Sequence, residues 1–135
     1  MNSKETLKQE KKRFSILARI KSATHASRGI GILIKTSHNA WGHIFIGVLA
    51  TYLGFILDIS NIEWVLLVFV MGLVIVAEAF NTAIEIDINL TSPEYHPYAR
   101  DTKDVAAGAV LIAVLISIIF ALFIFAPKIL LYVNI

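Results

Sequence analysis

Three polar residues interrupt an apolar stretch that is otherwise typical of a membrane helix, namely Glu78, Asn81 and Glu85. Their spacing is i, i+3 and i+7, so on a helix their directions fall within about 60° of one another and form one polar stripe. A carboxylate inside a bilayer costs several kcal/mol unless it is paired or faces water. The stripe is therefore expected to face the protein interior or a polar cleft.

More charged and ionisable residues follow this stretch, and together with the stripe they form a dense cluster: Asp87, Glu94, His96, Arg100, Lys103 and Asp104. Carboxylates in such a cluster can hold Mg²⁺, which prefers oxygen ligands and shares them with phosphates. Lys103 could pair with a phosphate, and Asn81 could orient a hydroxyl or a carboxylate. Glu78 is the deepest of the group and could act as the general base for an alcohol whose tail stays in lipid. This charge placement is compatible with a lipid kinase.

Two other interpretations of the same carboxylates remain open. Glu78 and Glu85 could be structural and bond to other helices of one bundle, or they could belong to a proton or ion pathway. The sequence contains no GxxxxGK[ST] motif and no kinase glycine loop, so the known soluble nucleotide-binding motifs are excluded.

The composition indicates which kind of protein positions these residues. Hydrophobic residues make up 57% of the 135 residues, more than soluble proteins usually have, and the length suits one small domain. The chain has no cysteine, which excludes disulfides and cysteine-based metal sites. The composition therefore predicts an all-α integral membrane protein.

Three apolar stretches are long enough to span a bilayer, since about 20 residues are needed: they run from about 40 to 57, 64 to 83 and 105 to 126. Nine of the twelve Lys and Arg lie in the first 35 residues, which places the N-terminus in the cytoplasm by the positive-inside rule. The connection 58–63 should then lie outside, and the connection 84–104 should return to the cytoplasm.

The basic N-terminal arm has apolar residues at helical spacing, which predicts a surface helix over about 13–36. Residues 1–12 are polar and expected to be flexible, so 13–135 form the single domain. Pro93 and Pro97 should interrupt the helices after the second span. We expect a new helix to restart at Asp101 or Thr102, either of which could be its cap.

The segments "EAFNTAIE" (78–85) and "SPEYHPYARDTKDVAAGAV" (92–110) resemble the prokaryotic diacylglycerol kinase family, which includes the undecaprenol kinases of Gram-positive bacteria. The resemblance extends over about 19–127. It implies a surface helix plus three transmembrane helices, assembled as a homotrimer in the bacterial plasma (inner) membrane. It also implies transfer of the γ-phosphate of ATP to a membrane lipid alcohol with Mg²⁺, at sites shared between neighbouring subunits, and no nucleic acid partner.

Roles follow from this resemblance position by position. Glu78 matches the general base, Asn81 matches the residue that supports it, and Glu85 matches a ligand of Mg²⁺ and the nucleotide. The remaining positions expected to bind ATP are His25, Glu94, Tyr95, His96, Lys103 and Asp104.

The chain departs from the family pattern at Ser37, in the block "SHNAWGH" (37–43), where relatives commonly have a glutamate that is a second metal ligand. Asn89 is a second departure, since many relatives have aspartate there. The residues of the two matching segments look closer to the undecaprenol kinases, which favours undecaprenol as the acceptor, with diacylglycerol as the alternative. Ser37 also leaves open a catalytically impaired relative that acts as a membrane scaffold.

Overall fold

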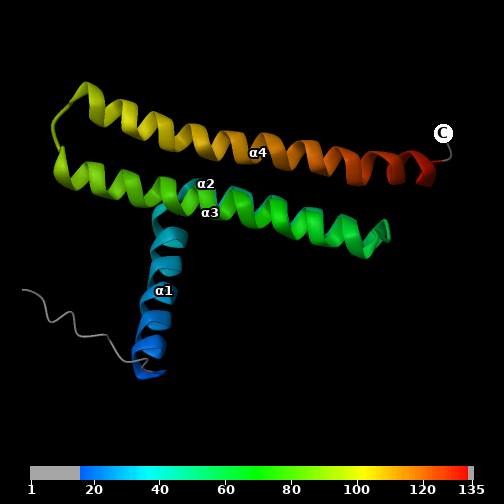
Figure 1. Cartoon of the computed structure of the whole chain (residues 1–135). Helices are drawn as coiled ribbons and strands as arrows, with labels where there is room; N and C mark the ends of the chain where they lie inside the picture. Colours follow the sequence, from blue (N-terminus) through cyan, green and yellow to red (C-terminus); the bar gives the residue numbers. More distant parts are fainter. Residues whose placement is uncertain (1–15, 134–135) are drawn as a thin grey trace, which may run out of the picture.

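The computed structural model describes residues 16–133, which form four helices (Figure 1). Their bounds are α1 Ile16–Thr36, α2 His38–Ile56, α3 Asn61–Thr91 and α4 Pro97–Tyr132. The predicted flexible segment 1–12 and the first residues of the predicted surface helix, 13–15, lie outside the described residues. Within the described range the all-helical prediction is confirmed.

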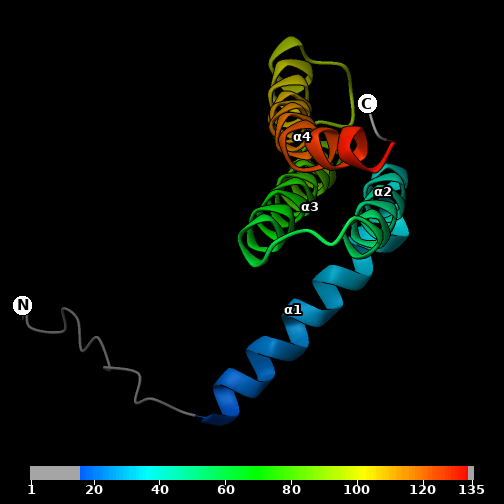
Figure 2. The same ribbon diagram turned by 90° about the vertical axis from the view of Figure 1, so that its right-hand side faces the viewer.

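Helices α2, α3 and α4 form a bundle, and α1 projects away from it (Figures 1 and 2). Helices α3 and α4 run antiparallel and pack along their length. A buried apolar cluster lies where α2 turns into α3, and it contains Ile59, Leu67, Ile124 and Phe125. This cluster holds together the end of the bundle that is remote from the polar stripe.

Three of the described helices, α2, α3 and α4, are long and apolar enough to cross a membrane. Helices α3 and α4 have 31 and 36 residues, so they are about 46 and 54 Å long, more than the roughly 30 Å of hydrocarbon in a bilayer. The second and third predicted spans lie inside α3 and α4, and the first ends one residue beyond α2, at the C-cap Leu57. The extra turns at the end of α3 and the start of α4 carry Glu85 and Lys103.

The connection between α3 and α4 is short, since α3 ends at Thr91 and α4 begins at Pro97. Proline fits the first helical turn because its missing N–H needs no partner there. His96 is the N-cap and accepts a 3.3 Å hydrogen bond from the backbone N–H of Tyr98. The prediction that Asp101 or Thr102 caps this helix was wrong, because Pro97 starts the helix one turn earlier.

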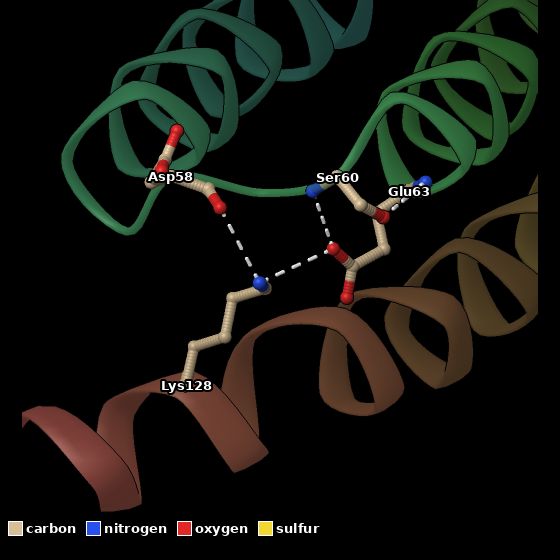
Figure 3. A network of polar contacts seen from close by, with 4 residues as sticks. All are labelled: Asp58, Ser60, Glu63 and Lys128. Carbon is tan, nitrogen blue, oxygen red and sulfur yellow. Dashed lines mark hydrogen bonds and ion pairs between the residues drawn. The ribbon is translucent and has the colours of Figure 1, made fainter.

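A polar network joins the three helices at the end remote from the stripe (Figure 3). Ser60 caps α3 and exchanges hydrogen bonds with Glu63, which is a capping box. Lys128 of α4 lies 3.3 Å from the Glu63 carboxylate and donates to the carbonyl oxygen of Asp58 at 3.4 Å. These contacts tie α4 to the connection between α2 and α3.

Gly54 is required by the close approach of α2 to the start of α3. A Cβ atom at Gly54 would lie 2.7 Å from the ring of Trp64 and 3.1 Å from Ile59. The Trp64 ring also packs on Phe55, with ring centroids 4.8 Å apart, so it has little room to move. Gly54→Ala is therefore expected to lower the free energy of unfolding by about 1–3 kcal/mol, the usual cost of overpacking.

Thermal unfolding in detergent micelles measures this effect. Gly72→Ala is the matched control, because a Cβ atom at Gly72 meets nothing within 4 Å. The control should be neutral or slightly stabilising, since alanine favours helix more than glycine does. Equal unfolding temperatures for the two variants would contradict the packing argument.

Candidate active site

Glu78 is the centre of the candidate site. It lies on α3 with only 1% of its surface exposed. Its Oε1 accepts a 2.5 Å hydrogen bond from Ser37 Oγ, whereas its Oε2 is buried without a hydrogen-bond partner in the described part of the chain. A buried carboxylate with one free oxygen is unusual, because buried polar atoms are nearly always paired. The free oxygen can accept a proton or a donor from a bound molecule.

Asn81 and Glu85 continue the stripe along α3. Asn81 is 4% exposed, and its Nδ2 donates to Glu85 Oε1 at 3.1 Å. The Oδ1 of Asn81 is a second buried acceptor without a partner among the described residues. Glu85 is exposed. The predicted stripe therefore faces the interior at Glu78 and Asn81 and reaches the surface at Glu85.

An open cavity of about 430 Å³ lies over Glu78 and Asn81. It is lined from α2 by His38, Asn39, Gly42, His43 and Ile46, and from α4 by Ala107, Val110, Leu111 and Val114. A second cavity of about 520 Å³ shares His43, Ile46 and Val114 with the first and has an almost entirely apolar lining. The two adjoining cavities form a polar end at Glu78 and an apolar extension between α2, α3 and α4.

Lys103 connects the start of α4 to the end of α3 by a hydrogen bond. Its Nζ donates to Asn89 Oδ1 at 2.6 Å. Asn89 follows Glu85 by four residues, so both lie on the same face of α3. Asp104, by contrast, forms an exposed 3.5 Å ion pair with Arg100 within α4.

The other predicted ATP-binding residues do not join Glu78 within this chain. His25 is exposed near the middle of α1, the helix that projects away from the bundle (Figure 1). Glu94, Tyr95 and His96 are exposed in the short connection between α3 and α4. The predicted nucleotide residues thus lie on four segments: α1, α3, the connection between α3 and α4, and the start of α4.

The stripe provides oxygen atoms that suit Mg²⁺, although residues 16–133 contain no group of three or more His, Asp or Glu arranged to hold a metal. The oxygens are those of the Glu85 carboxylate and the Oδ1 of Asn81, which has no hydrogen-bond partner among the described residues. Mg²⁺ commonly binds through one or two carboxylates and completes its shell with water and phosphate. The residues present therefore fit this ion.

The sequence singles out Ser37 only as the replacement of a metal-binding glutamate of the family, and it does not reveal what Ser37 contacts. Its contact with Glu78 joins residues 41 positions apart, and no local pattern predicts such a contact. Thr82 was also missed; it is 5% exposed and lies beside Asn81. Its position four residues after Glu78 could have revealed it, since that spacing shares a helix face.

Comparison with known proteins gives a consistent set of relatives. The family model described as prokaryotic diacylglycerol kinase matches residues 24–125. An undecaprenol kinase of Bacillus subtilis (strain 168) is 39% identical over 108 residues, covering 80% of this chain and 88% of the relative. A diacylglycerol kinase of Escherichia coli (strain K12) is 36% identical over 100 residues, covering 74% and 70%. One from Synechocystis sp. is 34% identical over 99 residues, covering 73% and 57%.

Proposed function

The chain belongs to the prokaryotic diacylglycerol kinase family, and we propose that it uses ATP and Mg²⁺ to phosphorylate undecaprenol in the membrane. The observation that supports the proposal most directly is Glu78 itself, a buried carboxylate that lines the polar end of a largely apolar cavity and has one oxygen without a hydrogen-bond partner among the described residues. A long lipid alcohol is likewise polar at one end, where its hydroxyl lies, and apolar along the rest of its chain. Its hydroxyl would lie at Glu78 and its chain in the apolar extension.

The proposed reaction needs a proton acceptor and a positioned phosphate. Glu78 removes the proton from the lipid hydroxyl as the hydroxyl oxygen forms its bond to the γ-phosphorus of ATP. The bond between that phosphorus and the bridging oxygen breaks at the same time, and ADP leaves. Asn81 donates a 3.1 Å hydrogen bond to Glu85, which orients the Glu85 carboxylate.

Charge neutralisation supplies most of the remaining catalysis in phosphoryl transfer. Glu85 would hold Mg²⁺, which shields the charge of the phosphate oxygens when bound. Lys103 would steady the phosphates, because its ammonium is held on the same face of α3 as Glu85. The resemblance assigns nucleotide contacts to His25, Glu94, Tyr95, His96 and Asp104.

A homotrimer with shared sites would bring these segments together. Helix α1 projects from its own bundle, so its His25 could reach the nucleotide site of a neighbouring copy. The proposed topology puts the N-terminus in the cytoplasm, because most of the Lys and Arg precede the first span. The three apolar helices and the family make the chain a multi-pass membrane protein.

The acceptor can be tested directly with the purified protein in micelles. The protein would be offered undecaprenol or diacylglycerol with labelled ATP and Mg²⁺, and the lipids would be separated by thin-layer chromatography. We expect label on undecaprenol, in line with the relative whose length is covered to 88%. Label on diacylglycerol alone would favour diacylglycerol as the acceptor, the lipid after which other relatives are named.

The same assay tests whether the chain is an active kinase or a catalytically impaired member of the family. A chain that labels neither lipid with Mg²⁺ or Mn²⁺ would contradict the kinase proposal and favour a scaffold. Movement of charge across vesicles without ATP would favour an ion pathway instead.

A further inference from the structure

We infer that Ser37 is a positioning residue that holds the Glu78 carboxylate in one orientation, an inference that rests on the function proposed for Glu78. Ser37 Oγ donates to Glu78 Oε1 at 2.5 Å and accepts from the backbone N–H of Ala40 at 3.0 Å. A serine hydroxyl has one proton and two lone pairs. Because the Ala40 N–H takes a lone pair, the proton is free to point at Glu78.

The backbone around Ser37 is held in place as well. Ser37 is the N-cap of α2, and its own N–H donates to the carbonyl oxygen of Leu33 at 2.9 Å. Trp41 Nε1 donates to the carbonyl oxygen of Ile34 at 2.9 Å and so spans the junction of α1 and α2. The hydroxyl that contacts Glu78 therefore belongs to the junction of α1 and α2, whose backbone is held by hydrogen bonds.

This contact makes the two oxygens of Glu78 unequal. Oε1 already accepts a hydrogen bond from Ser37, which lowers its basicity, whereas Oε2 has no partner among the described residues and is the more basic oxygen for the lipid proton. A hydrogen bond to a carboxylate is stronger than one between neutral groups, so it also limits rotation of the carboxyl group. Holding a reacting group in one orientation lowers the barrier because the entropy of alignment is lost before the reaction.

The inference gives Ser37 a different role from the metal ligand that the family resemblance leads one to expect. A glutamate at this position would bring a second negative charge against Glu78, whereas serine brings a donor. The departure at Ser37 therefore does not by itself indicate lost activity.

The first test compares turnover in three variants. Ser37→Ala is expected to lower kcat about ten-fold, the effect of losing one hydrogen bond to a charged group, with KM for ATP nearly unchanged. Ser37→Thr keeps the hydroxyl and should recover most of kcat. Ser60→Ala is the matched control, since it removes the serine cap of α3 far from Glu78 and should leave kcat unchanged.

The second test measures the contact without using turnover. Thermal unfolding of Ser37→Ala, Glu78→Ala and the double variant forms a cycle whose effects should not add, because the two side chains are bonded. The same cycle with Ser60→Ala should be additive, because Ser60 precedes Glu78 by 18 residues, about 27 Å along α3.

Several outcomes would overturn the inference. They are unchanged kcat in Ser37→Ala, no recovery in Ser37→Thr, additive effects in the first cycle, or phosphate that is transferred from ATP to Ser37 itself. A parent chain that labels no lipid would instead overturn the proposed function, and the unfolding cycle would still decide whether Ser37 holds Glu78.

Discussion

Replacing Glu78 by glutamine is expected to lower kcat for phosphorylation of the lipid about a thousand-fold, within the range of 10²–10⁴ typical for a general base. Glutamine has the size of glutamate, and its amide oxygen can still accept the hydrogen bond from Ser37. It cannot take up the hydroxyl proton of the lipid. The loss should therefore appear in kcat, while the protein remains folded.

Glu63→Gln is a suitable control for Glu78→Gln. Glu63 lies in the first turn of the same helix, 15 residues before Glu78, where it contacts Ser60 and Lys128 (Figure 3). The control removes the same charge and should affect unfolding rather than turnover. Initial rates with labelled ATP and unfolding temperatures in micelles measure both effects. Turnover near that of the parent chain in Glu78→Gln would exclude Glu78 as the base.

Replacing Glu85 by glutamine is expected to raise the Mg²⁺ concentration needed for half-maximal activity about a hundred-fold. Residues that only hydrogen-bond to a metal ligand already change metal affinity by about 10–100-fold, so removing a direct carboxylate ligand should lie at the upper end of that range. Glutamine keeps an oxygen that can accept from Asn81, so the hydrogen bond along the stripe can persist. The variant thus removes charge and little else.

A titration with Mg²⁺ at saturating ATP measures the Glu85 effect. Asp87→Asn is the control, because Asp87 is an exposed carboxylate two residues later, on the far face of the same helix. It loses the same charge from the same end of α3, so general electrostatic effects cancel in the comparison. The same Mg²⁺ requirement in both variants would mean that Glu85 is not a ligand.

Local sequence patterns were sufficient to predict the three long helices and the helix face that Glu78 and Asn81 share. The apolar stretches predict three long helices because a membrane requires about 20 apolar residues per span. The spacing of Glu78 and Asn81 predicts a shared face because a helix turns 100° per residue, and both side chains are buried as expected. Pro93 predicts a break after α3, which the structure has at Ser92.

Local patterns were less informative about the ends of helices. The apolar stretches mark the membrane, but α3 and α4 extend beyond them as long as backbone hydrogen bonds and caps allow. Pro97 at the first turn and His96 as cap set the start of α4 earlier than Asp101 or Thr102. The extended turns bring Lys103 to Asn89, which shares a face of α3 with Glu85.

Hydropathy and helical periodicity act between near neighbours, so the order of the residues is enough to predict three apolar helices and a polar face on the second of them. The contact of Ser37 with Glu78, the unpartnered oxygen of the Glu78 carboxylate and the cavity that Glu78 lines become visible only in the folded chain. These features depend on how α2, α3 and α4 pack against one another. A contact between residues 41 positions apart leaves no periodic pattern, so it has to be seen in the folded chain.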